Sequence, residues 1–407
     1  MTDAFGALER SFRQGSGRAV AALIRVTGDF DLAEEAVQDA FEVALRTWPS
    51  RGVPDNPEAW IVTTARNRAI DKLRRDRVGR AKTEEAAAQI AELETIGVDV
   101  HEIPDDRLRL LFTCCHPALA MDARVALTLR TVAGLSTREI ARAFLVPEPT
   151  LGQRLTRAKR KIHDAAIPYR VPPRELLPER LDGVLAVLYL VFNEGYAATE
   201  GELLRAEMGD EAIRLARLVD RLLPGDEDVR ALLALMLLQH ARHAARTDEA
   251  GDLVLLEDQD RSRWDHAMID EGLSVLAERA RRPGAYRLQA EIAACHARAP
   301  RPEDTDWPEI ATLYGRLAAL QSSPVVELNR AAAVAMADGP ESGLRMLEPL
   351  QPDLDRYHLF HSAKADLLRR AGRTDDAVEA YRRALDLTTN DAERRFLERR
   401  LTALQRA

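Results

Sequence analysis

The chain is poor in cysteine, in long apolar runs and in alternating β-branched stretches, and each shortage argues against a class of protein. Its 407 residues include three cysteines and no C-x-x-C pair, which argues against a disulfide framework and a four-cysteine zinc site. No apolar run approaches the ~20 residues that span a bilayer, and residues 1–10 lack the apolar core of a signal peptide. We therefore expect a cytoplasmic protein with no membrane partner.

Helical periodicity runs through almost the whole chain. Ala, Leu, Arg and Glu dominate, all of them good helix formers, while stretches of strand type are nearly absent. Hydrophobic residues make up 46% of the chain, which is enough for a core, and charged residues make up 30%. These features predict an all-α protein.

The formal net charge of −8 hides an uneven distribution. Residues 1–170 hold 26 Lys and Arg against 24 Asp and Glu, whereas residues 171–407 hold 32 against 42. Residues 60–82 carry eight basic side chains and two acids, and residues 150–162 carry five and none. Between them, residues 83–106 carry eight acids and no Lys or Arg. Such blocks indicate specialised segments, so the net charge alone does not exclude nucleic acid as a partner.

Two helices are predicted around the first basic block. Apolar residues at helical spacing run from Asp31 to Trp48, Pro49 is expected to end this helix, and residues 50–57 predict a loop. A second helix is expected over residues 58–75, with Trp60 as a core anchor on its buried side. Its other side carries polar and basic residues: Arg66, Asn67, Arg68, Asp71, Lys72, Arg74 and Arg75.

Residues 125–162 predict a helix-turn-helix. Ser136, with Glu139 three positions on, is a capping-box pattern that starts a short helix over residues 137–144. Val146 and Pro147 form a turn, and a second helix follows over residues 150–162. Arg and Gln on such a helix can read base edges, and Lys can contact phosphate. The alternative is an arginine-rich solvated helix inside an ordinary bundle.

Three segments in this order resemble the sigma-70 family in its compact extracytoplasmic-function (ECF) subgroup. Asp31-Leu-Ala-Glu-Glu-Ala-Val-Gln-Asp-Ala-Phe41 resembles the part of region 2 that docks on the clamp helices of RNA polymerase. Trp60-Ile-Val-Thr-Thr-Ala-Arg-Asn-Arg-Ala-Ile-Asp-Lys-Leu-Arg-Arg75 resembles the region 2 helix that faces the −10 promoter element. Gly134-Leu-Ser-Thr-Arg-Glu-Ile-Ala141, followed by residues 150–160, resembles region 4, which reads the −35 element. Pro149 and Gly152 depart from the usual family pattern at the start of the recognition helix.

The resemblance implies three sets of site residues. Those for polymerase binding are Glu35, Gln38, Asp39 and Phe41; those for the −10 element are Arg66, Asn67, Asp71, Lys72, Arg74 and Arg75; and those for the −35 element are Thr150, Gln153, Arg154, Arg157, Lys159, Arg160 and Lys161. Promoter melting exposes unstacked bases, so polar groups such as Asn67 can meet base edges while Arg and Lys hold phosphates. For Asp71, an intrahelical pair with Arg74 or Arg75 is an equal alternative.

Two sigma domains are therefore expected, followed by a longer helical extension. The expected order is sigma region 2 over residues 1–82, an acidic linker over 83–106, sigma region 4 over 107–170, a helical extension over 171–285 and tetratricopeptide-like repeats over 286–407. In family members the linker passes through basic nucleic-acid channels of the polymerase, where its eight carboxylates can mimic RNA by charge. A solvated spacer is the equal alternative.

The end of the chain resembles a helical repeat. Residues 357–390 fit the tetratricopeptide pattern of 34 residues, with small and aromatic residues at the expected places: Ala365, Gly372, Ala377, Tyr381 and Ala384. Residues 323–350 fit an earlier, degenerate repeat. The whole extension resembles that of one ECF group, often encoded beside small proteins of the DGPF (YCII-related) type. In that group the extension is thought to control the sigma activity, which implies a regulatory protein or a ligand bound to the repeats.

Neither an enzyme nor a metal protein is expected. The chain has no Gly-rich phosphate loop, no H-E-x-x-H and no nucleophile elbow. The adjacent cysteines of Cys114-Cys115-His116 are interpreted as buried small residues and not as metal ligands. His240 and His243 are not interpreted as ligands either, so no cofactor is predicted. Six polar residues of the extension are candidates for the lining of a polar pocket: Asn193, Glu194, Glu257, Asp258, Asp260 and Arg261.

The expected function is that of a promoter-specificity subunit, which binds core RNA polymerase and promoter DNA. The alternative is a free-standing helix-turn-helix transcription regulator with a repeat-type sensor domain. The segments 31–41 and 60–75 favour the sigma factor, because a plain repressor has no need of them.

Overall fold

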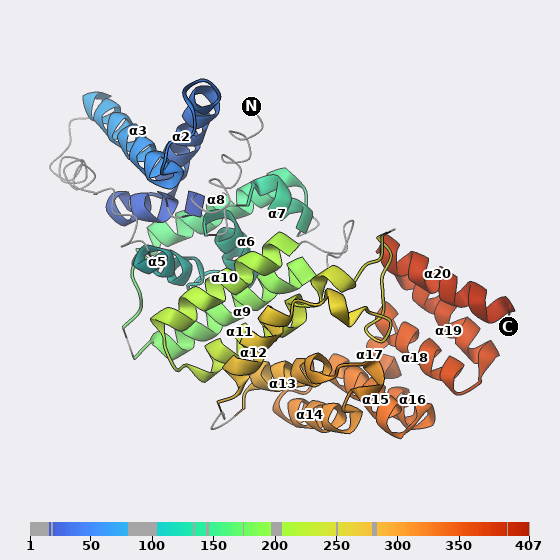
Figure 1. Cartoon of the computed structure of the whole chain (residues 1–407). Helices are drawn as coiled ribbons and strands as arrows, with labels where there is room; N and C mark the ends of the chain where they lie inside the picture. The colour runs from blue at the N-terminus through green and yellow to red at the C-terminus, as the bar shows by residue number, and fades with distance from the viewer. Residues whose placement is uncertain are drawn as a thin grey trace. The chain divides into compact units, whose positions relative to one another are not determined.

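The computed structural model describes residues 16–17, 19–79, 104–132, 135–143, 146–173, 175–196, 206–249, 251–278, 283–388 and 390–406. These residues form helices and connecting turns, and an isolated bridge between Thr247 and Leu253 is their one β contact. The prediction of an all-α fold is therefore confirmed. The chain divides into two compact units, Met1–Val191 and Phe192–Ala407, and the division falls inside helix α9 (Figure 1).

The first helix that the structure describes in this unit covers residues 16–27, apart from residue 18. The further helices are α2 (Phe30–Arg51), α3 (Pro57–Gly79), α5 (Pro104–Cys114), α6 (Met121–Thr131), α7 (Thr137–Ala143), α8 (Glu148–Asp164) and α9 (Leu177–Tyr196). Residues 80–103, which hold most of the predicted acidic linker, lie outside the described residues, as do Gly134 and Phe144.

Helices α2 and α3 pack against each other. The Asp29 carboxylate caps α2 by accepting from the backbone N–H of Asp31 (2.9 Å) and of Leu32 (3.0 Å). The sequence predicted that Pro49 ends this helix, but α2 continues to Arg51. The helix tolerates a proline in its last turn because only one backbone donor is lost. The chain leaves the helix at Gly52 instead, with φ +87° and a backbone bond of 3.0 Å to the Trp48 carbonyl.

The helix over residues 16–27 packs against the helices that follow α3. A side chain at Gly17 would place its Cβ 2.4 Å from the Val132 carbonyl oxygen, so only glycine permits this approach to the end of α6. The Tyr169 hydroxyl lies 2.9 Å from the carbonyl oxygens of both Ala21 and Asp106. Burial, together with the Asp106 carboxylate, raises the pKa of that phenol. The helix over residues 16–27 is thus built into the same unit as α5–α8.

Helix α9 continues this packing. The Arg180 guanidinium donates to the Phe112 carbonyl (2.7 Å). A Cβ at Gly183 would lie 3.3 Å from the Arg124 guanidinium. The first half of α9 therefore covers α5 and the start of α6. Val184, Val187, Leu188 and Val191 are fully buried.

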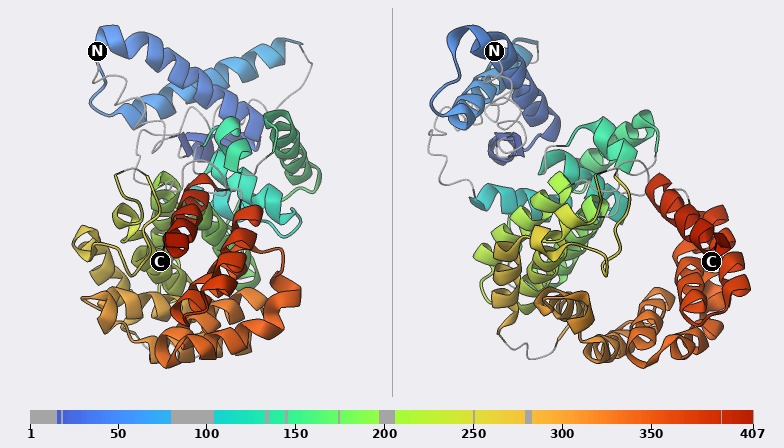
Figure 2. Two further views of the ribbon diagram at one scale, coloured as in Figure 1. Left: turned by 90° about the vertical axis from the view of Figure 1, so that its right-hand side faces the viewer. Right: turned by 45° about the vertical axis from the view of Figure 1, so that its right-hand side comes forward.

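The second unit is a succession of helices. They are α10 (Ala206–Leu222), α11 (Glu227–His240), α12 (His266–Leu276), α13 (Ala285–Arg298), α14 (Trp307–Leu320), α15 (Pro324–Asp338), α16 (Pro340–Leu347), α17 (Gln351–Leu354), α18 (His358–Arg370), α19 (Thr374–Leu387) and α20 (Asp391–Arg406). Short 3-10 turns lie between them: η2 (His243–Ala245), η3 (Arg261–Arg263), η4 (Pro302–Asp304) and η5 (Glu348–Leu350). From α13 to α20 successive helices pack side by side in a curved stack (Figure 2).

The last helix pairs carry the residues that predicted a repeat. Ala365, Ala377, Tyr381 and Ala384 are all at most 1% exposed in the core between α18 and α19. Gly372, with φ +75°, makes the turn between these two helices. The boundaries of the helical pair agree with the 34-residue pattern, while its assignment as a tetratricopeptide repeat stays a prediction.

A polar loop crosses the stack, and we call residues 251–260 the strap. The Asp252 carboxylate pairs with Arg395 (2.6 Å) and Arg399 of α20, and the Glu257 carboxylate pairs with Arg370 of α18 (3.0 Å). Asp260 caps η3 through the Ser262 N–H (2.9 Å). Glu257 and Asp260 are among the polar residues that the sequence offered for a pocket, and Asp252 is not; here all three carboxylates hold the loop in place.

Just beyond the strap, Arg261 and Trp264 anchor the loop to the helical stack. The Arg261 guanidinium donates to the His296 carbonyl (2.7 Å) and lies 4.6 Å from the ring centroid of the buried Trp264. Burial, together with Arg242 and Arg261, lowers the pKa of His296 to about 4. The imidazole is therefore neutral at physiological pH.

Candidate nucleic-acid and polymerase interface

Helix α8 has one buried and one exposed side. It begins at Glu148, two residues earlier than predicted, because Pro149 suits the first turn of a helix. Its buried residues recur every three or four positions and pack the helix onto α6 and α7: Leu151, Leu155, Ala158 and Ile162. Exposed on the other side are Thr150, Gln153, Arg157, Arg160 and Lys161.

Two basic residues of α8 pair with carboxylates on other helices of the first unit, and Arg160 pairs with Asp164 of α8 itself (3.4 Å). Arg154 lies 3.4 Å from the Asp122 carboxylate. The Lys159 ammonium donates to the carboxylates of Asp31 (2.9 Å) and Glu34 (3.0 Å) on α2, and its side chain is 13% exposed. In this arrangement Lys159 faces α2 and not the solvent.

The carboxylate of Glu34 is the centre of this contact. It also lies 3.6 Å from Arg130 of α6 and is 15% exposed. Burial alone would lower the pKa of Lys159, but the carboxylates of Glu34 and Asp31 outweigh it and raise that pKa. Glu34 and Arg130 were not among the predicted site residues, because no local pattern links positions more than 90 residues apart.

Helix α3 presents the predicted −10 residues on one side. Asn67, Asp71, Arg74 and Arg75 are exposed, and Arg66 is partly buried. The Arg75 guanidinium donates to the Asp71 backbone carbonyl (3.2 Å), so their intrahelical contact uses the backbone and not the carboxylate. Lys72 pairs with Glu35 of α2. Trp60, predicted as a core anchor, is partly buried and packs edge-on against the buried Trp48, with ring centroids 5.5 Å apart.

The predicted polymerase-binding residues differ in exposure. Gln38 is exposed, Asp39 is half-buried and Glu35, although paired with Lys72, keeps 57% of its side chain exposed. Phe41 is 5% exposed and belongs to the core of the unit. Direct contact with a partner is therefore open to the three polar residues in this arrangement, while Phe41 fixes the position of the helix that carries them.

The cysteines and histidines form no metal centre in the described residues. Cys114 and Cys115 are buried, with their sulfurs 3.2 Å from the Thr131 hydroxyl and 3.6 Å from the Thr128 hydroxyl. Burial raises the pKa of the Cys115 thiol to about 12 and that of Cys114 further still, so both are protonated and unreactive. His240 bonds to the Asp210 carboxylate through Nε2 (2.9 Å).

Across the described helices, none has the length and apolarity to cross a membrane.

Comparison with known proteins agrees with this geometry. Residues 12–78 match the family described as sigma-70 region 2, residues 109–162 match sigma-70 region 4, and residues 180–280 match a family of unknown function, DUF6596. The uncharacterized protein R00370 of Rhizobium meliloti is 46% identical over 99% of this chain and 97% of its own length. No solved structure matches the chain.

More distant relatives carry names. The probable ECF RNA polymerase sigma factor SigI of Mycobacterium tuberculosis is 27% identical over 42% of this chain and 62% of its own length. The ECF RNA polymerase sigma factor SigK of Mycobacterium bovis is 26% identical over 36% of this chain and 79% of its own length.

A helix-turn-helix joined to a second helical domain of region 2 type defines a promoter-recognition subunit. The chain belongs to the sigma-70 family and is an ECF sigma factor with a helical C-terminal extension. Sigma factors are non-enzymatic, DNA-binding subunits of transcription initiation, so the chain is not an enzyme.

Proposed function

We propose that the chain directs RNA polymerase to a set of promoters and that its C-terminal extension controls this activity. One observation carries the first part: α8 buries four apolar residues and turns Gln153, Arg157, Arg160 and Lys161 to the solvent. A helix packed in this way can enter the major groove without disturbing its core. Arg157 and Gln153 then read base edges of the −35 element, while Arg160 and Lys161 contact phosphates. The match to region 2 favours this function over that of a free-standing helix-turn-helix regulator, which would have no need of region 2.

Arg157→Ala is expected to weaken promoter binding by the polymerase complex about 5- to 150-fold, the effect of losing one bidentate contact to guanine worth roughly 1–3 kcal/mol. Arg154→Ala should have a smaller effect, because Arg154 must first leave Asp122. Run-off transcription and footprinting on genomic promoter fragments measure both effects. Arg382→Ala, which removes an exposed arginine of α19, is the matched control. Unchanged protection of the −35 element in both variants would contradict the assignment.

The exposed side of α3 is proposed to meet the −10 element. Asn67 and Asp71 offer hydrogen-bonding groups to unstacked bases, and Arg74 and Arg75 lie on the same exposed side as phosphate contacts. Arg66, at the edge of this side, supplies further positive charge, and Lys72 can do so once it leaves Glu35. The Lys72–Glu35 pair joins this helix to the helix proposed for polymerase docking.

Replacing Gln38 by Ala and Asp39 by Arg together is expected to abolish co-purification with core RNA polymerase. Gln38 is exposed and Asp39 is half-buried, and neither belongs to the buried residues of α2, so the helix keeps its core while the docking face changes charge. Asp55→Arg, an equal charge reversal in the exposed loop between α2 and α3, is expected to bind normally. Native affinity of the double variant, at unchanged helical content, would show that this face does not dock.

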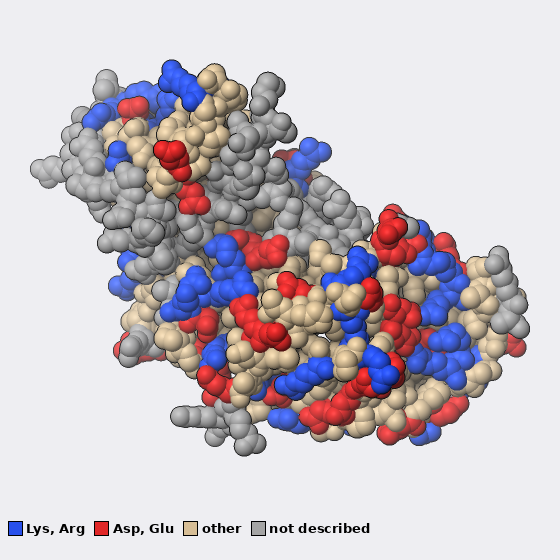
Figure 3. Space-filling view, in the orientation of Figure 1, with Lys and Arg blue, Asp and Glu red and all other residues tan. Residues whose placement is uncertain are grey.

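Control by the extension is proposed to act through the arrangement of the sigma domains. Helix α9 supports the proposal, because it packs on α5 and α6 through Arg180 and Gly183 and then continues into the second unit at Phe192. Figure 3 shows Lys and Arg interspersed with Asp and Glu over the described C-terminal helices on this face. A mixed surface of this kind favours a positioning role over a simple acidic cover for the basic blocks.

A further inference from the structure

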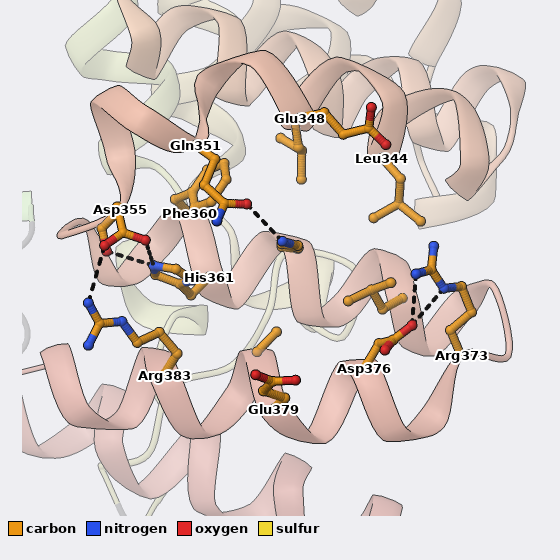
Figure 4. A pocket seen from close by; sticks show the side chains of 14 residues that line it. Leu344, Glu348, Gln351, Asp355, Phe360, His361, Arg373, Asp376, Glu379 and Arg383 are labelled. Atoms are coloured by element: carbon orange, nitrogen blue, oxygen red, sulfur yellow. Dashed lines mark hydrogen bonds and ion pairs between the residues drawn. The ribbon is translucent and has the colours of Figure 1, made fainter.

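Helices α16, α18 and α19, together with η5 and α17, line an open cavity of about 460 Å³ (Figure 4). Its apolar lining comes from core residues, among them Leu347, Phe360 and Leu368, which are at most 3% exposed. His361, Lys364 and Leu368 line it along one side of α18. Because a helix rises 1.5 Å per residue, these three positions span about 10 Å, the length of roughly three extended residues.

The charged groups at the two ends of the cavity are paired. The Arg383 guanidinium lies 3.3 Å from the Asp355 carboxylate, and His361 Nε2 bonds to the Asp355 backbone carbonyl (2.8 Å). At the other end Arg373 lies 2.7 Å from the Asp376 carboxylate. These ion pairs neutralise both arginines.

Two carboxylates in the middle differ from the rest. Figure 4 places Glu348 and Glu379 on opposite sides of the cavity. Both are exposed, and the described residues provide neither of them with an ion pair. The single unpaired cation that lines the cavity is Lys364, whose ammonium donates to the Gln351 side-chain oxygen (3.1 Å). The middle of the cavity thus carries two carboxylates against one ammonium.

The other side of the same helices is covered by the chain itself. The strap pairs with Arg370, Arg395 and Arg399, and its Leu255 lines a second cavity of about 310 Å³ between α15, α18 and α20. The strap therefore forms part of the wall of the second cavity, whereas no residue of the strap lines the cavity between α16, α18 and α19.

We propose that the cavity between α16, α18 and α19 binds an extended peptide segment of a partner protein. The segment presents an Arg or Lys side chain between Glu348 and Glu379 and an adjacent apolar side chain against Leu347, Phe360 and Leu368. Lys364 and Gln351 pair with its backbone. The lining positions along α18 match the length of about three extended residues, which suits a short chain segment, and the excess of carboxylates in the lining selects a basic residue. This inference goes beyond the sigma activity, because binding here involves neither polymerase nor promoter.

The test uses the full chain and an array of immobilised, capped tetrapeptides in which each position is fixed in turn. Enrichment of Arg and Lys at one position, with Leu, Met or Phe beside it, is expected. A Glu348→Gln, Glu379→Gln double variant should lower the affinity for the selected peptide about tenfold, since charge-assisted hydrogen bonds are lost. Glu379→Lys should shift selection toward acidic peptides. Glu398→Gln, an exposed glutamate of α20, is the control and should change nothing.

Three results would overturn the assignment. One is an array without positional preference. Another is a preference for basic residues that the double variant keeps, which would place the peptide elsewhere. The third is full displacement of the selected peptide by spermidine at equal concentration, which would indicate a site for small organic cations. Both substitutions to Gln are isosteric and lie at exposed positions, and circular dichroism of each variant checks its fold.

Discussion

Truncating the chain between α9 and α10, within residues 197–205, is expected to reduce promoter-dependent transcription about 5- to 150-fold. This range corresponds to coupling free energies of roughly 1–3 kcal/mol. The reason is that the extension, on the proposal above, helps the two sigma domains adopt their working arrangement. Run-off transcription with purified core polymerase compares the cut chain with the full chain on the same promoters.

The position of the cut decides what this experiment measures. A cut after Pro172 would remove all of α9, and with it the Arg180 bond to Phe112 and the burial of Val184 and Leu188. Loss of activity would then reflect a damaged region 4. A cut after α9 keeps these contacts and removes the second unit apart from the end of the helix. Comparison of the two cuts separates support of region 4 from control by the extension.

The opposite outcomes are equally informative. If the extension covers the basic blocks at 60–82 and 150–162, the chain cut after α9 should be more active than the full chain. The full chain should then respond to salt, because exposed charge pairs are screened. Equal activity of cut and full chain would contradict both forms of control.

Local sequence patterns predicted the helices well and their long-range contacts poorly. The apolar spacing of α2, α3 and α8 is a property of one helix face, so each helix could be placed from the sequence alone. The errors lie at helix ends: Pro49 is tolerated in the last turn of α2, and Pro149 starts α8 early. Both follow from the position of proline within a turn, which composition does not reveal.

The sequence predicted which helix surfaces make up the site. It did not predict which residues of these surfaces form ion pairs with one another. Lys159 looked like a phosphate contact because it lies in a basic stretch, whereas its partner Glu34 lies 125 residues away. In the same way, the polar run from Glu257 to Arg261 suggested a pocket, whereas Glu257 pairs with Arg370 and Arg261 bonds to the His296 carbonyl. Ion pairs between distant segments depend on tertiary packing, which no spacing rule reports.

Lys159→Met is expected to lower the free energy of unfolding by roughly 1–3 kcal/mol, because the largely buried Glu34 carboxylate then loses the ammonium that donates a hydrogen bond to it. The charge left behind is the Glu34 carboxylate, which is 15% exposed, has its Oε1 without a hydrogen-bond partner, and would retain Arg130 at 3.6 Å. Lys161→Met, on the exposed side of the same helix, should change stability by less than about 0.5 kcal/mol. Urea unfolding of the full chain, followed by circular dichroism, measures both.

A second substitution, which removes the charge of Glu34 as well, tests whether the loss of stability comes from the carboxylate left without Lys159. Glu34→Gln added to Lys159→Met should recover stability to within about 1 kcal/mol of the original chain, because neither charge is then buried alone. The raised pKa of Lys159 means that its stabilising effect is present below the ordinary lysine pKa of about 10.4 and is lost as pH rises through the higher folded value. At neutral pH the full effect is therefore expected. An unchanged unfolding midpoint for Lys159→Met would mean that α8 and α2 are apart in solution and that Lys159 is free to meet the −35 element.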